Sequence, residues 1–225
     1  MRQRPKPSPL PSLEAQNKTP RDFDREIKRS FDCQYLIGID EAGRGPLAGP
    51  VFVAAVLLKN DDFPLASEIR DSKQVSPERR KILALEIRRR AEKISLAWSY
   101  PSEIDKLNIL KATLRAMNRA AQKAVQFKTA PVLVDGPFSI PDFKGRQLPI
   151  IKGDQKSLAI ACASIIAKVY RDRWMETIDR RFPGYGFSKH KGYGTKDHLK
   201  ALDFLGVSSA HRKSYAPVIN ALKTH

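Results

Sequence analysis

The chain contains little cysteine and no long hydrophobic run. Its 225 residues include only two cysteines, Cys33 and Cys162. They do not provide a structural zinc site of the four-ligand kind. They fit a reducing compartment better than a disulfide framework. No stretch reaches the roughly 18 apolar residues that a membrane span needs. The start, MRQRPKPSPLPSL, is interrupted by prolines and lacks the apolar core of a signal peptide. We therefore expect a cytoplasmic protein with no membrane partner.

Acidic residues are also scarce relative to basic ones. The chain has 24 Asp and Glu against 41 Lys and Arg, a formal net charge of +17. Residues 1–30 carry eight basic and four acidic residues, so +13 of this charge belongs to the remainder. Such an excess indicates an anionic partner, with nucleic acid ahead of an acidic membrane surface.

The order of apolar segments predicts an α/β fold with a mixed sheet. Residues 1–30 read as a basic, Pro-rich extension that is mobile in part, and residues 31–225 as the main domain. Alternating or continuous apolar runs predict strands at 35–39, 51–58, 94–100, 131–134 and 147–152. Helical spacing and caps predict helices at 21–31, 76–92, from 102 with a long part at 109–127, 157–182 and 195–206.

Three of these predicted strands end at acidic residues. Asp40 and Glu41 follow the first, Asp135 ends VLVD, and Asp154 follows LPIIKG. In an open α/β sheet, strand ends on one side line a common crevice. Carboxylates gathered there would repel one another unless a cation lay among them. Their oxygen atoms favour Mg²⁺ or Mn²⁺, and two such ions can support hydrolysis of a phosphodiester.

Each acid also has a purely structural explanation. Asp135 followed by glycine is typical of a turn, Asp154 could cap the helix that starts near residue 157, and Asp40 with Glu41 could be a solvated loop pair. The coincidence of three acidic strand ends in a basic chain favours metal-dependent phosphodiester chemistry.

Other motifs surround these acids in the sequence. The loop Gly43-Arg44-Gly45 is neither a Walker loop nor a dinucleotide fingerprint, and it could be a tight strand connection or a loop that approaches a sugar-phosphate closely. The helix at 157–182 carries a narrow polar stripe, which could be a buried network or could face the acidic crevice. The stripe consists of Ser157, Ser164, Lys168 and Asp172.

A second glycine-rich segment, GYGFSKHKGYGTKDH, interleaves aromatic and basic residues. Aromatic rings among lysines can stack on sugars or bases while the charges follow the backbone. A plain surface loop has the same composition. His190, His198 and His211 lack zinc-type spacing, so we assign none of them as a ligand.

Taken together, these motifs resemble the ribonuclease HII family, the type 2 ribonucleases H. The matching pieces are GIDEAGRGPLAGPV, DSK at 71–73, VDG at 134–136, KGD at 152–154, ASIIAKVYRD at 163–172, GYGFSKHKGYGT at 184–195 and HRKSYAPV at 211–218. They occur in the family's order and extend over most of the chain.

The resemblance implies a ribonuclease H-like fold, a five-stranded mixed sheet flanked by helices with a helical C-terminal part. It implies an enzyme that cleaves the RNA strand of RNA–DNA hybrids and incises 5′ to single ribonucleotides in DNA. Two Mg²⁺ or Mn²⁺ ions would support hydrolysis to a 3′-hydroxyl and a 5′-phosphate.

The resemblance also implies roles for individual residues. The family's four acidic residues fall on Asp40, Glu41, Asp135 and Asp154, and its ribose-reading loop and tyrosine on Gly43, Arg44, Gly45 and Tyr193. We expect Ser164, Lys168 and Asp172 to support the acids, and a basic surface to hold the duplex. That surface comprises Lys73, Lys189, Lys191, Arg212 and Lys213.

The expected partners are RNA–DNA hybrids and ribonucleotide-containing DNA, and we expect a monomer. The sequence points to no particular replication or repair partner. Two other functions fit part of the pattern. A resolvase or integrase-type nuclease would use the acids similarly but cut all-DNA duplexes. A non-enzymatic nucleic-acid-binding protein would explain the charge but not the acids at the strand ends.

Overall fold

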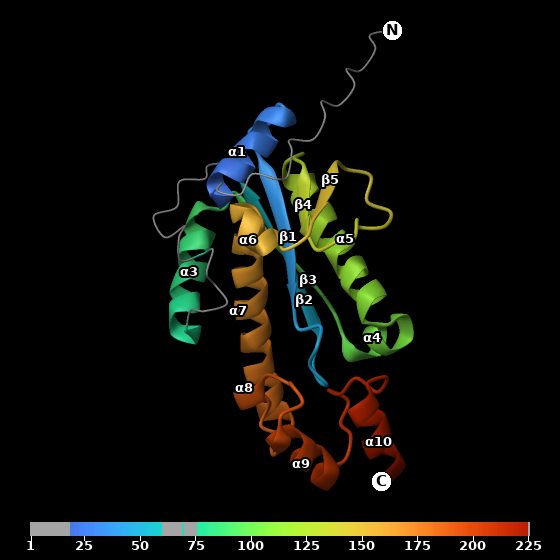
Figure 1. The fold of residues 1–225 in the computed structure, drawn as a ribbon. Coiled ribbons are helices and arrows are strands. Elements are labelled where there is room, and N and C mark those ends of the chain that lie inside the picture. Colours follow the sequence, from blue (N-terminus) through green and yellow to red (C-terminus); the bar gives the residue numbers. More distant parts are fainter. Residues whose placement is uncertain (1–18, 60–68, 70–75, 225) are drawn as a thin grey trace.

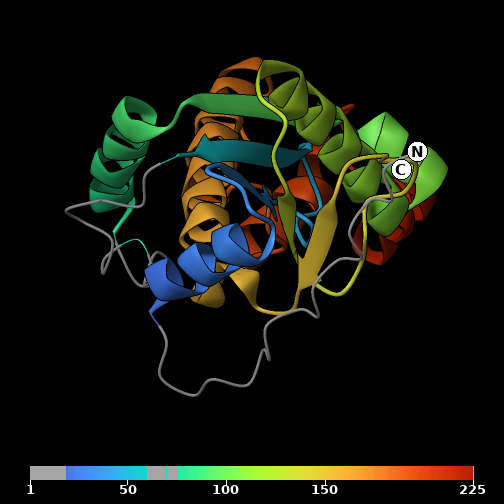
Figure 2. The same cartoon turned by 90° about the horizontal axis from the view of Figure 1, so that it is seen from above.

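The computed structural model describes residues 19–59, 69 and 76–224, and in this part of the chain a mixed sheet lies between layers of helices (Figures 1 and 2). The strand order is β3-β2-β1-β4-β5. β1 pairs antiparallel with β2, as β2 does with β3, whereas β1, β4 and β5 run parallel. The five strands are β1 Leu36–Ala42, β2 Val51–Leu58, β3 Lys93–Ser99, β4 Val132–Asp135 and β5 Gln147–Ile150. The predicted α/β class and mixed sheet are confirmed.

The helices agree with the sequence-based prediction to within one or two residues wherever a long periodic segment exists. They are α1 Pro20–Ser30, α3 Pro77–Arg90, α4 Pro101–Leu107, α5 Ile109–Phe127, α6 Gly153–Lys156, α7 Leu158–Arg181, α8 Phe187–His190, α9 Lys196–Leu205 and α10 Ala216–Thr224. The start predicted at Ser102 is wrong, because Pro101 occupies the first turn of α4. Asn108, at φ 69°, then ends α4 and caps α5.

The two faces of the sheet are covered by different helices. α7 packs on β1 and β2 on one face, and α5 packs on β1, β2 and β3 on the other. Side chains alternate along β1, so Ile37 and Ile39 join the α5 side while Gly38 and Asp40 lie toward α7. This alternation decides which helix each active-site candidate meets.

Gly38 permits the close approach of α7 to β1. A Cβ atom at this position would lie 2.0 Å from the backbone carbon of Ala159, a contact that no side chain can occupy. Any larger residue would therefore push α7 away from the strand that carries Asp40.

The C-terminal helices extend the molecule beyond one end of the sheet, as predicted. Helices α8, α9 and α10 gather next to the connection between β1 and β2 (Figure 1). Three backbone hydrogen bonds of 2.8 Å attach them there: the N–H of Leu47 donates to the carbonyl of Gly192, that of Gly49 to Ala210, and that of Arg212 to Leu47.

Helix α1, from the predicted extension, packs on the domain. Ile27 is buried, and the Asp24 carboxylate accepts a 2.9 Å hydrogen bond from the N–H of Ala159 at the start of α7. None of the described helices is both long enough and apolar enough to cross a bilayer.

Candidate active site

Asp40 and Glu41 lie within β1, which pairs with β2 as far as Ala42, three residues beyond the predicted end of the strand. Asp40 is 5% exposed and accepts a 2.7 Å hydrogen bond from the N–H of Glu41. Burial, together with the neighbouring carboxylates of Glu41 and Asp135, raises the pKa of Asp40 well above its ordinary value. Asp40, Glu41 and Asp135 are thus close enough for the negative charges of the other two to oppose ionisation of Asp40.

Glu41 points to the opposite side of β1 from Asp40, because consecutive strand residues alternate. Burial raises the pKa of Glu41, and the Arg44 guanidinium, 3.5 Å from its Oε1, opposes that shift. Arg44 is nearly half exposed, so its charge is free to meet solvent or an anion as well as Glu41.

Asp135 lies on the neighbouring parallel strand β4, and Asp154 lies in the short helix α6 that follows β5. Asp135 is the last residue of β4, and its Oδ1 accepts a 2.6 Å hydrogen bond from the N–H of Gly153. Asp154, 6% exposed, follows in the short turn of α6. Asp154 does not cap α7; the Ser157 hydroxyl does, by accepting from the N–H of Ile160 at 3.2 Å.

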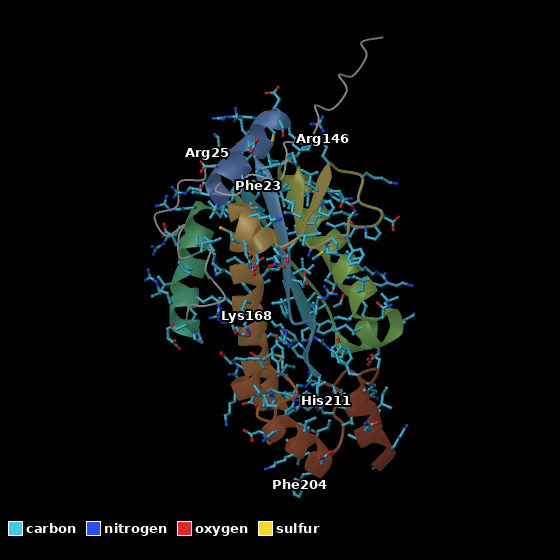
Figure 3. The ribbon with its side chains drawn as sticks, in the orientation of Figure 1. Phe23, Arg25, Arg146, Lys168, Phe204 and His211 are labelled. Carbon is cyan, nitrogen blue, oxygen red and sulfur yellow. The ribbon has the colours of Figure 1, made fainter. Side chains whose placement is uncertain are left out.

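The polar stripe on α7 separates into three roles. Ser157 is fully buried as the cap of α7. A hydrogen bond from the Ser164 side chain stabilises the charged form of Asp40 and lowers its pKa against the burial effect. Lys168, midway along α7 in Figure 3, forms a 2.7 Å ion pair with Asp172. Ser164 is therefore the stripe residue that reaches the acids directly.

The glycine loop after β1 lies beside Tyr193. A Cβ atom at Gly45 would lie 3.7 Å from Cε1 of the Tyr193 ring, and that ring is about half exposed. Gly43 has φ +97°, in the left-handed region that favours glycine. An exposed aromatic ring and an exposed loop thus lie side by side, a few residues from Asp40 and Glu41.

Among the described residues, no three His, Cys, Asp or Glu side chains are already arranged as a metal site. Like charges keep carboxylates apart when no cation lies between them. The donors at these strand ends are all carboxylate oxygens, which fit a hard divalent cation and not a soft one.

Comparison with known proteins decides the family. A family model described as "Ribonuclease HII" matches residues 37–218, a range that contains the four acids, the glycine loop and Tyr193. This chain belongs to the ribonuclease HII family. It is an endoribonuclease that acts on RNA–DNA hybrids.

Ribonuclease HII proteins from several bacteria resemble the chain over most of its length. That of Syntrophomonas wolfei is 49% identical over 185 residues, covering 82% of this chain and 71% of the relative. That of Albidiferax ferrireducens is 49% identical over 188 residues, covering 84% and 89%.

Solved structures support the ribonuclease H2 and H3 type of fold. The structure of the PCNA:RNase HII complex from Archaeoglobus fulgidus is similar with a TM-score of 0.68 at 28% identity, covering 83% of this chain and 96% of that one. Bst-RNase HIII in complex with Mn²⁺ has a TM-score of 0.68 at 20% identity, covering 84% and 69%.

Not every residue assigned to the ribonuclease HII substrate surface lies near the acids. Lys189 and Lys191 line a groove of about 610 Å³ between α3 and α7, and none of the four acids lines it. The ammonium of Lys191 lies 2.9 Å from a Glu176 oxygen and is only 19% exposed. Lys73, with the rest of the DSK motif, lies outside the described residues.

The prediction of Arg212 as a surface contact is wrong, since the side chain is fully buried. Lys213 beside it is exposed, as expected. Arg171 is similarly buried and was not singled out from the sequence. Basic residues are mostly solvated, so composition alone could not have separated these two from the remaining 39 Lys and Arg.

His190, His198 and His211 form a packed cluster of rings, with centroids 4.4 Å apart for His190 and His198 and 5.3 Å apart for His198 and His211. His211 is labelled in Figure 3, in the C-terminal part of the molecule. His198 Nδ1 lies 2.9 Å from the Tyr193 carbonyl oxygen, and its Nε2 lies 3.1 Å from Nε2 of His211. The N–H of Ser208 donates to Nδ1 of His211 at 3.1 Å, so Nε2 of His211 carries the proton donated to His198. This chain of hydrogen bonds fixes the backbone at Tyr193.

Proposed function

We propose that this ribonuclease HII cleaves the RNA strand of hybrids, and incises 5′ to single ribonucleotides in duplex DNA, by metal-dependent hydrolysis at Asp40, Glu41, Asp135 and Asp154. The observation that carries the proposal is the buried, unneutralised carboxylate of Asp40 beside those of Glu41 and Asp135. Such a group costs folding free energy, and its presence at the ends of parallel strands is explained if a cation completes it.

Two Mg²⁺ or Mn²⁺ ions would be held by these four acids. Bound there, divalent cations would lower the pKa of a water molecule and stabilise the charge on the departing O3′ oxygen. The chain's own contribution is to position the oxygen ligands. Gly153 N–H orients the Asp135 carboxylate, and Ser164 orients Asp40. Lys168 and Asp172 would support the helix face from which Ser164 projects.

The Gly43–Gly45 loop and Tyr193 would recognise the ribonucleotide. The loop is exposed and its glycines allow close approach of a sugar-phosphate, while the half-exposed Tyr193 ring provides a stacking surface next to it. Because water would attack the phosphorus atom, the ribose 2′-hydroxyl would not be the nucleophile. It would be the group by which the enzyme distinguishes a ribonucleotide from a deoxyribonucleotide. The exposed Arg44 would meet a phosphate.

The basic surface would hold the duplex through phosphates without reading its sequence. Lys189 and Lys213 are exposed and suit this role. Lys73 keeps its proposed role from the family motif alone, and Lys191 would have to leave Glu176 to reach a phosphate.

We also propose that the protein acts as a monomer in a reducing, cytoplasmic compartment, with residues 31–225 as the catalytic domain. Cys33 and Cys162 are both free thiols, and burial raises the pKa of each. Cys162 is buried and Cys33 partly buried, and a thiol that stays protonated is slow to oxidise.

The test uses three end-labelled duplexes: one with a single ribonucleotide, one RNA–DNA hybrid and one of DNA only. Each is incubated with Mg²⁺, Mn²⁺ or EDTA. Metal-dependent cutting of the first two, 5′ to the ribonucleotide in the first, is expected. Cutting of the all-DNA duplex would indicate a resolvase-type nuclease. Binding without cutting in either metal would refute the assignment of the four acids.

A further inference from the structure

Two buried arginines, Arg171 and Arg212, lie beneath the glycine loop without carboxylate partners. Their exposed fractions are 1% and 0%. Among the residues that the structure describes, no Asp or Glu lies within ion-pair distance of either guanidinium. Asp172 and Asp105 interact electrostatically with Arg171 and Arg212, respectively, but from beyond ion-pair distance. A buried charge with no counter-charge in contact is costly, so this pair requires an explanation beyond packing.

Both guanidinium groups are used to bind backbone carbonyl oxygens of the segment between β1 and β2. Arg212 donates to Gly43 at 2.6 Å, Arg44 at 2.7 Å and Gly49 at 2.9 Å. Arg171 donates to Ala48 at 3.2 Å, Pro50 at 3.1 Å and, from the second glycine-rich segment, Lys191 at 3.0 Å. The Tyr215 hydroxyl adds a 2.7 Å bond to the Arg44 carbonyl.

The carbonyls of Gly43 and Arg44 are bonded to buried side chains, whereas the N–H groups of the same loop make no hydrogen bond within the described part of the chain. The N–H groups of Gly43, Arg44 and Gly45 donate to no described residue, whereas those of Leu47 and Gly49 are bonded to Gly192 and Ala210. Because Arg44 and Gly45 are exposed and Gly43 is partly exposed, these three donors are open to a ligand. Successive free N–H groups of this kind favour an anion.

Glycine at position 43 belongs to the same arrangement. A Cβ atom there would lie 1.9 Å from Nε of Arg171, so the arginine occupies the space a side chain would need. The same arginine bonds the Lys191 carbonyl, two residues before Tyr193. The Arg171 guanidinium therefore fixes the position of the glycine loop relative to the segment that carries Tyr193.

We propose that Arg171 and Arg212 are positioning residues that hold the Gly43–Gly45 loop with its N–H groups outward, and that their unneutralised charges draw a phosphate of the nucleic acid to those N–H groups. This inference rests on the proposed ribonucleotide recognition by the same loop. The two guanidinium groups also repel each other, and a phosphate anion at the loop relieves that repulsion.

The decisive experiment is chemical rescue of Arg212→Ala. We expect kcat/KM for the single-ribonucleotide duplex to fall on the order of 100-fold, the effect of misplacing a recognition loop. Millimolar guanidinium chloride should restore much of this activity, and sodium chloride at the same concentration should not. Arg180→Ala is the matched control, since Arg180 is an exposed arginine on α7 and donates only to Thr177 on its own helix.

Arg212→Lys and Arg171→Lys keep the charge but cannot donate to three carbonyls at once. Both variants should fold, as judged by circular dichroism, and should lose discrimination between the single-ribonucleotide duplex and the long hybrid. Wild-type discrimination in both would overturn the inference, even if Arg212→Ala fails to fold. So would a folded Arg212→Ala enzyme with wild-type kcat/KM, or one that guanidinium does not rescue.

A binding measurement separates this inference from the proposed reaction. In EDTA, fluorescence anisotropy of a labelled ribonucleotide duplex should show a dissociation constant about tenfold higher for Arg212→Ala than for the wild type, as expected for lost hydrogen bonds to a charged group. If the wild-type enzyme cuts no substrate, the proposed function fails while this comparison still tests the loop. An unchanged dissociation constant refutes the positioning role.

Discussion

The acid cluster and the Gly43–Gly45 loop are neighbouring regions whose buried charges have opposite signs. Asp40 and Glu41 lie near the end of β1, just before the loop, whereas the buried Arg171 and Arg212 contact the loop from beneath. Burial and negative neighbours raise the pKa of Asp40, whereas burial and the Arg212 charge lower the pKa of Arg171 to about 10. Among the described residues, Arg44 and Glu41 form the one ion pair that joins the two regions, at 3.5 Å.

The two regions do not neutralise each other because hydrogen bonds to the backbone hold their charged groups in place. The arginines are fixed by loop carbonyls, and Asp135 by the N–H of Gly153. Under the proposed function, each region binds a ligand of the opposite charge: divalent cations at the acids and a phosphate at the loop. A ribonuclease needs both at one scissile bond, and the following predictions test each region separately.

The largest effect is expected from Asp135→Asn. The amide oxygen can still accept from Gly153 N–H, so the fold and its melting temperature should stay close to wild type, while cleavage falls by more than about 100-fold, beyond the loss seen when only a supporting group of a metal site is removed. Single-turnover cleavage assays in Mn²⁺ and Mg²⁺ measure this. Cleavage near the wild-type rate would show that Asp135 is not part of the reaction centre.

Substitution on the loop side should change substrate preference more than chemistry. Tyr193→Ala should reduce cleavage at single ribonucleotides by about 5- to 100-fold, the range for one lost stacking contact, and Tyr193→Phe should keep most of it. The ratio of kcat/KM for the single-ribonucleotide duplex to that for the hybrid is the readout. Equal ratios in Tyr193→Ala and the wild type would exclude ribose reading by this ring.

The histidine cluster under Tyr193 should make stability depend on pH. Burial, then the neighbouring His198, lowers the pKa of His211 to about 4, so the folded state favours the neutral ring. That stability is present above pH 6.5 and is lost as pH falls toward 4, by up to about 3 kcal/mol. Urea denaturation at several pH values should show a shallower fall for His211→Gln. Parallel curves would mean that His211 is not the group titrating.

The smallest effect is expected from Lys191. Because Glu176 already pairs with its ammonium, Lys191→Met should change the dissociation constant for duplex by less than about threefold, as for a surface ion pair. Lys189→Met is the comparison. The Lys189 ammonium lies 3.1 Å from Asp197, but that side chain is 80% exposed, so the pair is well solvated and the substitution should reduce the salt dependence of binding more. A larger effect at Lys191 would restore it as a phosphate contact.

The local sequence pattern was sufficient to predict most helices and strands, and to place the acids near strand ends. Val51–Leu58 and Ile109–Phe127 match their predicted bounds because each is a long segment with one clear period. β1 continues past its predicted end, through Asp40 and Glu41 to Ala42, because pairing with β2 extends a strand beyond its apolar run. Short turns such as α6 and α8 have too few residues for a periodic signal.

The sequence by itself determined the order of strands and helices, the acids near strand ends and the glycine loop, since each depends on neighbours a few residues apart. Only the tertiary structure decided which charges are buried. Arg212 meets Gly43 across 169 residues, and His211 meets His198 and the Tyr193 segment through packing of the C-terminal helices. Most lysine and arginine side chains are exposed to solvent, so a sequence alone gives no reason to expect a buried one. Only the packing of the whole chain shows that two arginines are buried, with backbone carbonyls as hydrogen-bond acceptors in place of water.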